Sequence, residues 1–277
     1  MKKKTALGSN LYTALVFLFL YAPIAVLIIF SFNSGKSTSV FEGFSLRWYE
    51  ELFRDSATLD AFKNSMIVAV VSSVISTVMG TAAATAIDGY KNKLVRKTVM
   101  TTTNIPMMNP EIVTGISMML LFVFIGGVFG KTGTLGFTTL IIAHTTFELP
   151  YVILNVLPKL RQTDRNLSEA AQDLGCTPLQ AFFKVVLPAI MPGIISGAMM
   201  AFTLSVDDFI ISYFVCGNTS QTLPIRIFSM TKRRVTPDMY ALSTLIFLAI
   251  LVLLIVSNAV KARGDKNVSK KKGGDTK

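Results

Sequence analysis

Charged residues are scarce in this chain. Only 16% of its 277 residues are charged, whereas 51% are hydrophobic, and the mean hydropathy is +0.55. A soluble domain carries about 25% charged residues, so the deficit indicates that lipid is the solvent. The formal net charge of +11 would also suit nucleic-acid binding. The Lys and Arg residues lie in short flanks between long uncharged runs, however, and this distribution favours a membrane protein with no nucleic-acid partner.

Cysteine and histidine are nearly absent. Cys176 and Cys216 fall on opposite sides of the membrane in the topology given below, which excludes a disulfide, and they match no metal-ligand spacing. The single histidine, His144, lies within an apolar run and is predicted to be a hydrogen-bonded residue of a helix bundle. The sequence therefore predicts no metal site and no catalytic residue, and it argues against an enzyme.

A phosphate-binding loop for ATP is missing too. The one candidate, Gly130-Lys131-Thr132, requires a glycine at position 125, where the chain has Ile125. The candidate also lacks a preceding strand and lies between two apolar runs. We therefore expect that this chain does not hydrolyse ATP and holds no cofactor of its own.

Long apolar runs are what the sequence has in abundance. A helix crosses the hydrocarbon with about 20 residues, and roughly six runs are long enough to cross once each. The first run is too long for a signal peptide, and no small-residue cleavage pattern follows it. We predict an all-α polytopic membrane protein with one transmembrane domain, 1–277, and spans at about 11–32, 65–87, 104–127, 134–156, 193–216 and 239–260.

The second run is rich in small residues, which let helix backbones approach closely in lipid. We predict that it packs inside the bundle, and we assign it no chemistry. These residues are Ser72, Ser73, Ser76, Gly80, Ala83 and Ala84.

Lys and Arg fall unequally on the two sides of the membrane. If the N-terminus is cytoplasmic, most of the 27 Lys and Arg residues lie in inner segments, among them the loop 157–192 and the basic tail 261–277. By the positive-inside rule, both termini are then cytoplasmic. The cluster from Lys232 to Arg234, in the last outer loop, is the exception.

The inner loop 157–192 is predicted to contain two short helices. Thr163 or Asp164 can cap a helix over residues 166–174, and Gly175 is the expected stop. Thr177 then caps a second helix, which Pro188 is expected to end before Pro192 opens the next span. Two helices that meet at a glycine form a rigid elbow suited to receive force from a partner.

This elbow resembles the EAA loop of ABC-importer permeases. The match consists of Glu169-Ala170-Ala171, then Gly175, then Val186-Leu187-Pro188. In that family the loop is the coupling helix that docks into a groove on the cytoplasmic ATPase. The resemblance therefore implies that the ATPase-coupling residues are Glu169, Ala170, Ala171, Gly175, Leu187 and Pro188.

Further stretches are similar to the spermidine/putrescine permeases of the PotC type. They are FSLRWYEELF (44–53), IPMMNPEIVTGIS (105–117), FELPYVILNV (147–156), LSVDDFIISYF (204–214), TLPIRIFSM (222–230) and TPDMYALSTL (236–245). The resemblance implies a six-helix type I permease of the bacterial inner membrane. It also implies a heterodimer with a second, homologous permease, two ATPase subunits that bind ATP and Mg, and an extracytoplasmic substrate-binding protein. The substrate would be spermidine or putrescine, moved by alternating access.

Two alternatives stay open at this point. The same architecture serves other solutes, such as iron, thiamine or phosphonates. A protein of another class, a self-sufficient cation channel or a proton-coupled carrier, would also have acids inside its spans. The elbow argues against this second class, because a carrier needs no dock for an ATPase.

Carboxylates in or near the apolar runs are candidates for the substrate pathway. Ionisable groups at that depth cost about 2.5–3.5 kcal/mol on insertion scales and are functional candidates by default. A path lined by carboxylates suits a cationic polyamine. The candidates are Glu111, Glu148, Asp207 and Asp208, with the rings of Phe209 and Tyr213 as cation–π partners.

Each acid also has a structural interpretation. The order Asn109-Pro110-Glu111 fits a helix start, where Glu111 would only complement the helix dipole. Glu148 precedes Pro150 and could bind backbone groups that this proline frees. On one continuous helix, Asp207 and Asp208 would point about 100° apart, one toward the pore and the other toward a partner subunit.

Overall fold

The computed structural model is helical throughout the part of the chain that it describes. Apart from the isolated bridge between Asn33 and Phe44, no strand pairing occurs among the described residues, and the all-α prediction is confirmed. The described residues are 2–37, 40–130, 133–164, 166–218, 220–232, 237–252 and 255, with side chains from residue 10 onward.

The chain forms two compact units, and each is treated by itself. The first unit comprises the residues up to Leu59 together with Arg226–Val252, and the second comprises Asp60–Ile225. Helices α3 (Ser56–Gly89) and α11 (Leu223–Thr231) pass from one unit into the other.

The first unit contains a loop organised by one buried asparagine. Its helices include α1 (Lys2–Phe30) and α2 (Arg47–Arg54). Between them, the amide nitrogen of Asn33 donates to the carbonyl oxygens of Ser37 and Val40, and the side-chain oxygen accepts from the backbone of Glu42 at 2.8 Å. The indole of Trp48 donates to the Asn33 carbonyl at 2.6 Å. These bonds hold the loop against the start of α2.

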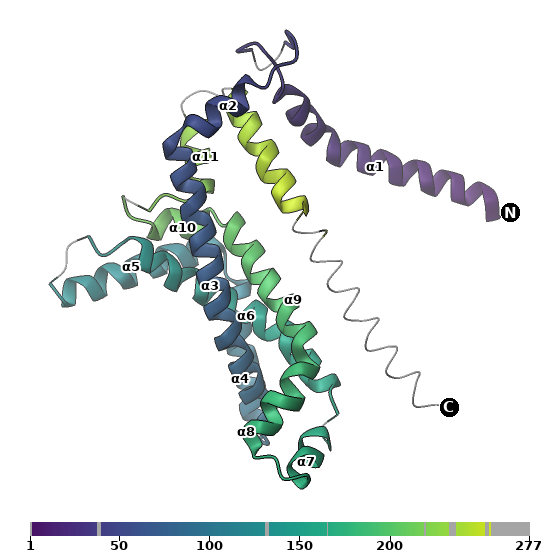
Figure 1. Ribbon diagram of the computed structural model, residues 1–277, viewed down its shortest axis with the longest axis vertical. Coiled ribbons are helices and arrows are strands. Elements are labelled where there is room, and N and C mark those ends of the chain that lie inside the picture. The colour runs from purple at the N-terminus through teal and green to yellow at the C-terminus, as the bar shows by residue number, and fades with distance from the viewer. Residues whose placement is uncertain are drawn as a thin grey trace. The chain divides into compact units, whose positions relative to one another are not determined.

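The second unit holds most of the remaining helices. Figure 1 shows α3, α6 and α9 along the unit, with α7 and α8 at one end. In chain order after α3, the elements are α4 (Lys93–Met108), α5 (Glu111–Val128), α6 (Phe137–Gln162), α7 (Asn166–Asp173), α8 (Pro178–Ala181), the π-helical turn η1 (Phe182–Val186), α9 (Leu187–Asp207) and α10 (Ile210–Val215).

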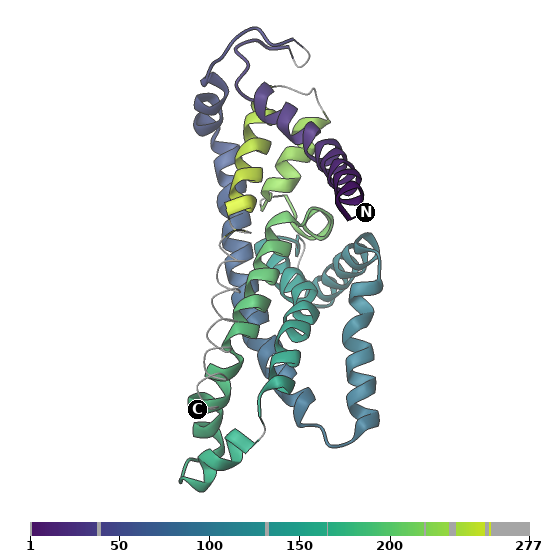
Figure 2. The same cartoon turned by 90° about the vertical axis from the view of Figure 1, so that its right-hand side faces the viewer.

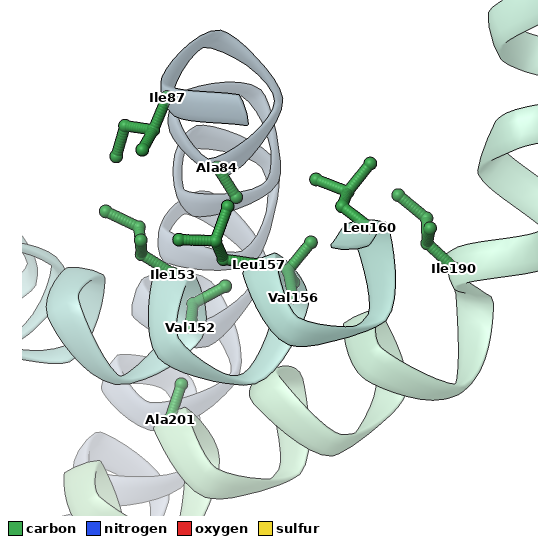
Figure 3. Packing of buried hydrophobic residues seen from close by; sticks show 9 residues of the cluster. All are labelled: Ala84, Ile87, Val152, Ile153, Val156, Leu157, Leu160, Ile190 and Ala201. Atoms are coloured by element: carbon green, nitrogen blue, oxygen red, sulfur yellow. The ribbon is translucent and has the colours of Figure 1, made fainter. Parts of the chain in front are cut away.

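Helix α6 is the centre of the second unit. In its most apolar window 61% of the residues are buried, against 33% for α3 and 22% for the helix Pro178–Asp207. Figure 3 shows α6 side chains packed between α3 and α9. Two glycines permit this approach: a Cβ on Gly80 would lie 2.6 Å from a Val152 methyl, and one on Gly197 would lie 3.3 Å from the Val152 Cα.

Five helices among the described residues are long and apolar enough to span a membrane. They are Asn10–Phe30, Ser56–Gly89, Glu111–Val128, Phe137–Gln162 and Pro178–Asp207. A shorter apolar helix covers Pro237–Val252. The predicted sixth span, 239–260, extends past the described residues. The basic tail, 261–277, lies outside them altogether. The number of spans and the single transmembrane domain therefore stay predictions.

The helix before α9 does not end where the sequence predicts. Pro188 was expected to stop it, and this is wrong, because α8, η1 and α9 form one uninterrupted helical path from Pro178 to Asp207. A proline inside an α-helix removes one hydrogen bond and clashes with the preceding turn. Here Pro188 directly follows the wider π-turn, in which Leu187 N–H donates to the Phe182 carbonyl. The wide turn leaves room for the proline ring.

The predicted start of α5 is confirmed to within one residue. Asn109 has extended backbone, as expected of a residue before proline. Pro110 is the N-cap, and Glu111 opens the helix. Residues 104–108, which were assigned to the third span, therefore belong to α4.

Candidate functional site

The elbow begins with the capped helix α7. The Asp164 carboxylate accepts from Asn166 N–H at 3.0 Å. At the other end Gly175 has φ +88° and donates to the Gln172 carbonyl at 2.9 Å, while Cys176 N–H donates to the Ala171 carbonyl at 3.0 Å. This is a Schellman stop, which requires the left-handed conformation that glycine adopts without strain. The predicted cap and stop are confirmed.

Helix α8 begins at Pro178, three residues after Gly175. Gln180 N–H donates to the Thr177 hydroxyl at 3.3 Å, and Thr177 N–H donates to the Gln180 side chain at 3.1 Å. This reciprocal capping box satisfies two backbone donors, with Pro178 in the first turn. Figure 2 shows α7 and α8 at the end of α9, so the elbow is attached to a long helix without an intervening loop.

The elbow exposes large apolar side chains. Leu174 is 88% exposed, Leu179 71% and Phe183 60%, whereas Ala171 and Ala181 point inward and are buried. Large apolar side chains exposed on a segment between two apolar helices are candidates for a contact with a partner. Of the predicted coupling residues, Glu169, Ala170 and Ala171 lie in α7, and Gly175 is its stop. Leu187 instead packs against the core cluster that Figure 3 shows, and Pro188 is exposed on the following helix.

A second feature of the unit is a break between α9 and α10. Helix α9 ends at Asp207, and Asp208 has extended backbone with φ −66° and ψ 120°. The Asp208 carboxylate accepts from Ile211 N–H at 3.3 Å and from Ser212 N–H at 2.7 Å, and so it caps the first turn of α10. The expectation of one continuous helix through both aspartates is therefore wrong: the side chain of Asp208 competes for backbone donors that a continuous helix would use.

Buried polar side chains surround this break. Glu148, on α6, is fully buried and accepts from the hydroxyls of Ser72 at 2.7 Å and Ser76 at 2.8 Å. His144, one turn earlier on α6 and 1% exposed, contacts Ser205 and Ser212. We call this set the polar cluster: Ser72, Ser76, His144, Glu148, Ser205, Asp208 and Ser212.

The polar cluster joins four helices, and it contains only some of the predicted pathway residues. Glu148 and Asp208 belong to it and are buried. Asp207 and Glu111 are exposed and lie outside it, and Tyr213 is exposed and stacks at a tilt on Phe209 with ring centroids 5.6 Å apart. The prediction that His144 is a hydrogen-bonded bundle residue is confirmed.

Sequence reasoning missed the polar partners of Glu148. The small-residue pattern predicts only packing for Ser72 and Ser76, although their i, i+4 spacing places two hydroxyls on one helix face. Within the described part of the chain, no group of three His, Cys, Asp or Glu side chains is placed to hold a metal ion.

The apolar helices and the elbow between two of them define a polytopic all-α membrane permease. Comparison with known sequences agrees. The chain belongs to the family described as binding-protein-dependent transport system inner membrane component, whose family model matches residues 76–270. It is therefore a membrane-embedded transport component and not an enzyme.

The relatives in this family include polyamine permeases. The chain is 40% identical to the putrescine transport system permease protein PotI of Escherichia coli (strain K12), over 90% of this chain and 89% of that protein. It is 34% identical to the spermidine/putrescine transport system permease protein PotC of Haemophilus influenzae, over 92% of this chain and 97% of that protein. The chain is 36% identical to the spermidine/putrescine transport system permease protein PotC of Escherichia coli (strain K12), over 88% of this chain and 90% of that protein.

Solved structures with the same fold come from ABC transporters. A chain of a bacterial transporter that imports the acidic polysaccharide alginate matches with a TM-score of 0.71 and 16% identity, over 96% of both chains. A chain of the MetNI methionine transporter, in inward-facing conformations, matches with a TM-score of 0.56 and 19% identity, over 82% of this chain and 99% of that one. These likenesses establish the ABC-permease fold.

Proposed function

We propose that this chain is one permease subunit of an ATP-driven importer that carries spermidine or putrescine across the bacterial inner membrane. The names of its relatives support the substrate class. The observation that carries the proposal is the doubly capped elbow with its exposed apolar surface. In this proposal a second, homologous permease completes the pore, and two ATPase subunits, which bind ATP and Mg, dock at the elbow. An extracytoplasmic binding protein delivers the substrate.

The path from the elbow into the membrane is a single helical segment. The path from Pro178 to Asp207 has no interruption, so a displacement of the elbow moves the whole segment. This segment packs tightly on α6, since a Cβ on Gly193 would lie 3.0 Å from the Asn155 carbonyl oxygen. Closure of the ATPase dimer would therefore rock α9 together with α6 and alternate the access of the pore.

The exposed groups beside the helix break suit a cationic substrate. Asp207 is exposed where α9 ends, and the exposed ring of Tyr213 is one α10 turn beyond the break. The C-terminal end of a helix carries partial negative charge, which adds to the charge of Asp207. A carboxylate and an aromatic face are complementary to the ammonium groups of a polyamine. Glu111, exposed at the start of α5, is a further acidic candidate for the substrate pathway.

The experiment is uptake of radiolabelled putrescine and spermidine by cells that lack their own polyamine importers and express the complete importer. We compare wild type with Gly175→Ala. Gly175 has φ +88° and no atom within 4 Å of an added Cβ, so the substitution only strains the backbone, by about 1–2 kcal/mol. We expect polyamine uptake that depends on ATP and that falls at least about fivefold in the variant.

Gly130→Ala is the matched control. Gly130 has φ +64° and also has no atom within 4 Å of an added Cβ, but it lies outside the elbow. Wild-type uptake is expected for this variant. If both glycine variants lose uptake equally, the elbow has no special part in coupling. If the assembled importer takes up neither polyamine, the substrate class is wrong.

A further inference from the structure

His144 lies between the two sides of the helix break. Its Nδ1 is 2.6 Å from the Ser205 hydroxyl in the last turn of α9, and its Nε2 is 2.9 Å from the Ser212 hydroxyl in the first turn of α10. One side chain of α6 therefore contacts both segments that flank Asp207 and Asp208.

The partners of His144 assign its tautomer. Nε2 also lies 3.4 Å from a side-chain oxygen of Asp208, and both oxygens of this side chain already accept from backbone N–H groups. A proton on Nε2 suits this neighbour, so Nδ1 is the acceptor and the Ser205 hydroxyl donates to it. Both ring nitrogens then have a partner, and the buried ring is held in one orientation.

The polar cluster extends this connection to α3. The Ser205 hydroxyl is 3.3 Å from the Ser72 hydroxyl, which itself donates to Glu148. Ser205, at the end of α9, is therefore hydrogen-bonded to α6 through His144, and its oxygen lies beside the Ser72 oxygen of α3 without a proton between them. The bond to His144 holds the end of α9 directly before the backbone changes direction.

The break gives the two adjacent aspartates opposite surroundings. Asp208 is 8% exposed and is held by two backbone N–H groups of α10 and by His144. Asp207, one residue earlier, is exposed. Successive side chains of extended backbone point to opposite sides. Because the backbone at Asp208 is extended and the Asp208 side chain points inward, the Asp207 side chain points outward.

We infer that His144 is a positioning residue for translocation: it holds Asp208 against α10 and thereby keeps Asp207 directed to the substrate. The inference rests on the proposed function, in which Asp207 contacts the cationic substrate. Asp208 then has a structural part and does not touch the polyamine. The two aspartates are not equivalent, although they are adjacent in sequence.

A double-mutant cycle on the complete importer tests this inference. His144→Phe keeps a ring of similar shape and removes both hydrogen bonds. We expect it to raise the KM for putrescine uptake about tenfold when Asp207 is present, and at most about twofold in the Asp207→Asn background. A residue that acts only on stability would change the amount of folded importer, and therefore the maximal uptake rate, and would leave KM unchanged in both backgrounds. A KM that rises by the same factor in both backgrounds would also overturn the inference.

Two further variants keep the test decisive. Thr145→Val is the matched control: Thr145 is adjacent and buried, and its hydroxyl has no hydrogen-bond partner among the described residues, so we expect a wild-type KM. Ser212→Ala removes only the α10 contact of the ring and serves if His144→Phe does not assemble. A rise in KM in His144→Phe or Ser212→Ala that depends on the presence of Asp207 supports the inference. An unchanged KM in the variant measured overturns it. If Asp207→Asn alone leaves uptake unchanged, the proposed substrate contact itself fails.

Discussion

At the scale of single residues, Glu148 illustrates how an acid is accommodated among apolar helices. An ionisable side chain inside a span costs about 2.5–3.5 kcal/mol on insertion scales. Ser72 and Ser76 lie one helical turn apart on α3 and donate to the two oxygens of this carboxylate. Two hydroxyl donors replace part of the lost hydration, so a fully buried acid is retained although no ion pair to it is found within the described part of the chain.

A different acid, Asp55, lies outside the spanning helices and makes stability depend on pH. Burial acts to raise the pKa of Asp55, but hydrogen bonds from Thr58 and Arg226 and the charge of Arg226 lower it below its usual 3.8. The Arg226 guanidinium donates to the carboxylate at 3.0 Å. An acid whose pKa is lowered by folding stabilises the folded state above its unfolded pKa, and this contribution is lost as the pH falls through the folded pKa.

We therefore predict that Asp55→Asn reduces the acid sensitivity of the importer. Between about pH 5 and about pH 3, the melting temperature of the wild type should fall further than that of the variant. Thermal unfolding of the purified importer in detergent measures this. Glu51→Gln is the control, because the Arg47–Glu51 pair is exposed on α2 and contributes little. Equal acid sensitivity of wild type and Asp55→Asn would contradict the account.

At the scale of helices, the sequence correctly predicted those helix ends that are stabilised by residues next to them in the chain. The cap at Asp164, the stop at Gly175 and the capping box at Thr177 each use side chains within three residues of the helix end. The membrane-spanning character of the helices also follows from local composition. These features could be read correctly because the physical cause and its effect lie in the same short segment.

Two helix boundaries depend on more than the local sequence and were missed. Pro188 is tolerated because the turn before it widens to π geometry. The presence of the proline alone does not predict this widening. The break at Asp208 is stabilised by His144, more than sixty residues earlier in the chain. Nothing near Asp208 identifies that partner, so the sequence predicted one continuous helix, with the two acids about 100° apart and no helix break between their surroundings.

At the scale of the whole molecule, the family and the apolar helices agree on a multi-pass inner-membrane permease. The proposed orientation, with both termini and the elbow in the cytoplasm, rests on the distribution of Lys and Arg. The elbow has a useful reporter in Cys176, which is partly exposed, whereas Cys216 is buried.

We predict that a membrane-impermeant maleimide labels Cys176 only from the cytoplasmic side. Inside-out vesicles, washed free of ATPase subunits, should be labelled, and right-side-out vesicles should not. Cys176→Ser is the control, and its loss of signal assigns the label. Labelling of Cys176 in right-side-out vesicles would reverse the proposed orientation.

The central claim is that this chain belongs to an importer that uses ATP to move polyamines. The most direct measurement is uptake of radiolabelled putrescine and spermidine into proteoliposomes that contain the chain, with and without its partner permease, ATPase subunits, binding protein and ATP. The account predicts accumulation of a polyamine only when all components and ATP are present. Polyamine entry through this chain without the ATPase subunits would instead identify a channel or carrier and contradict the account.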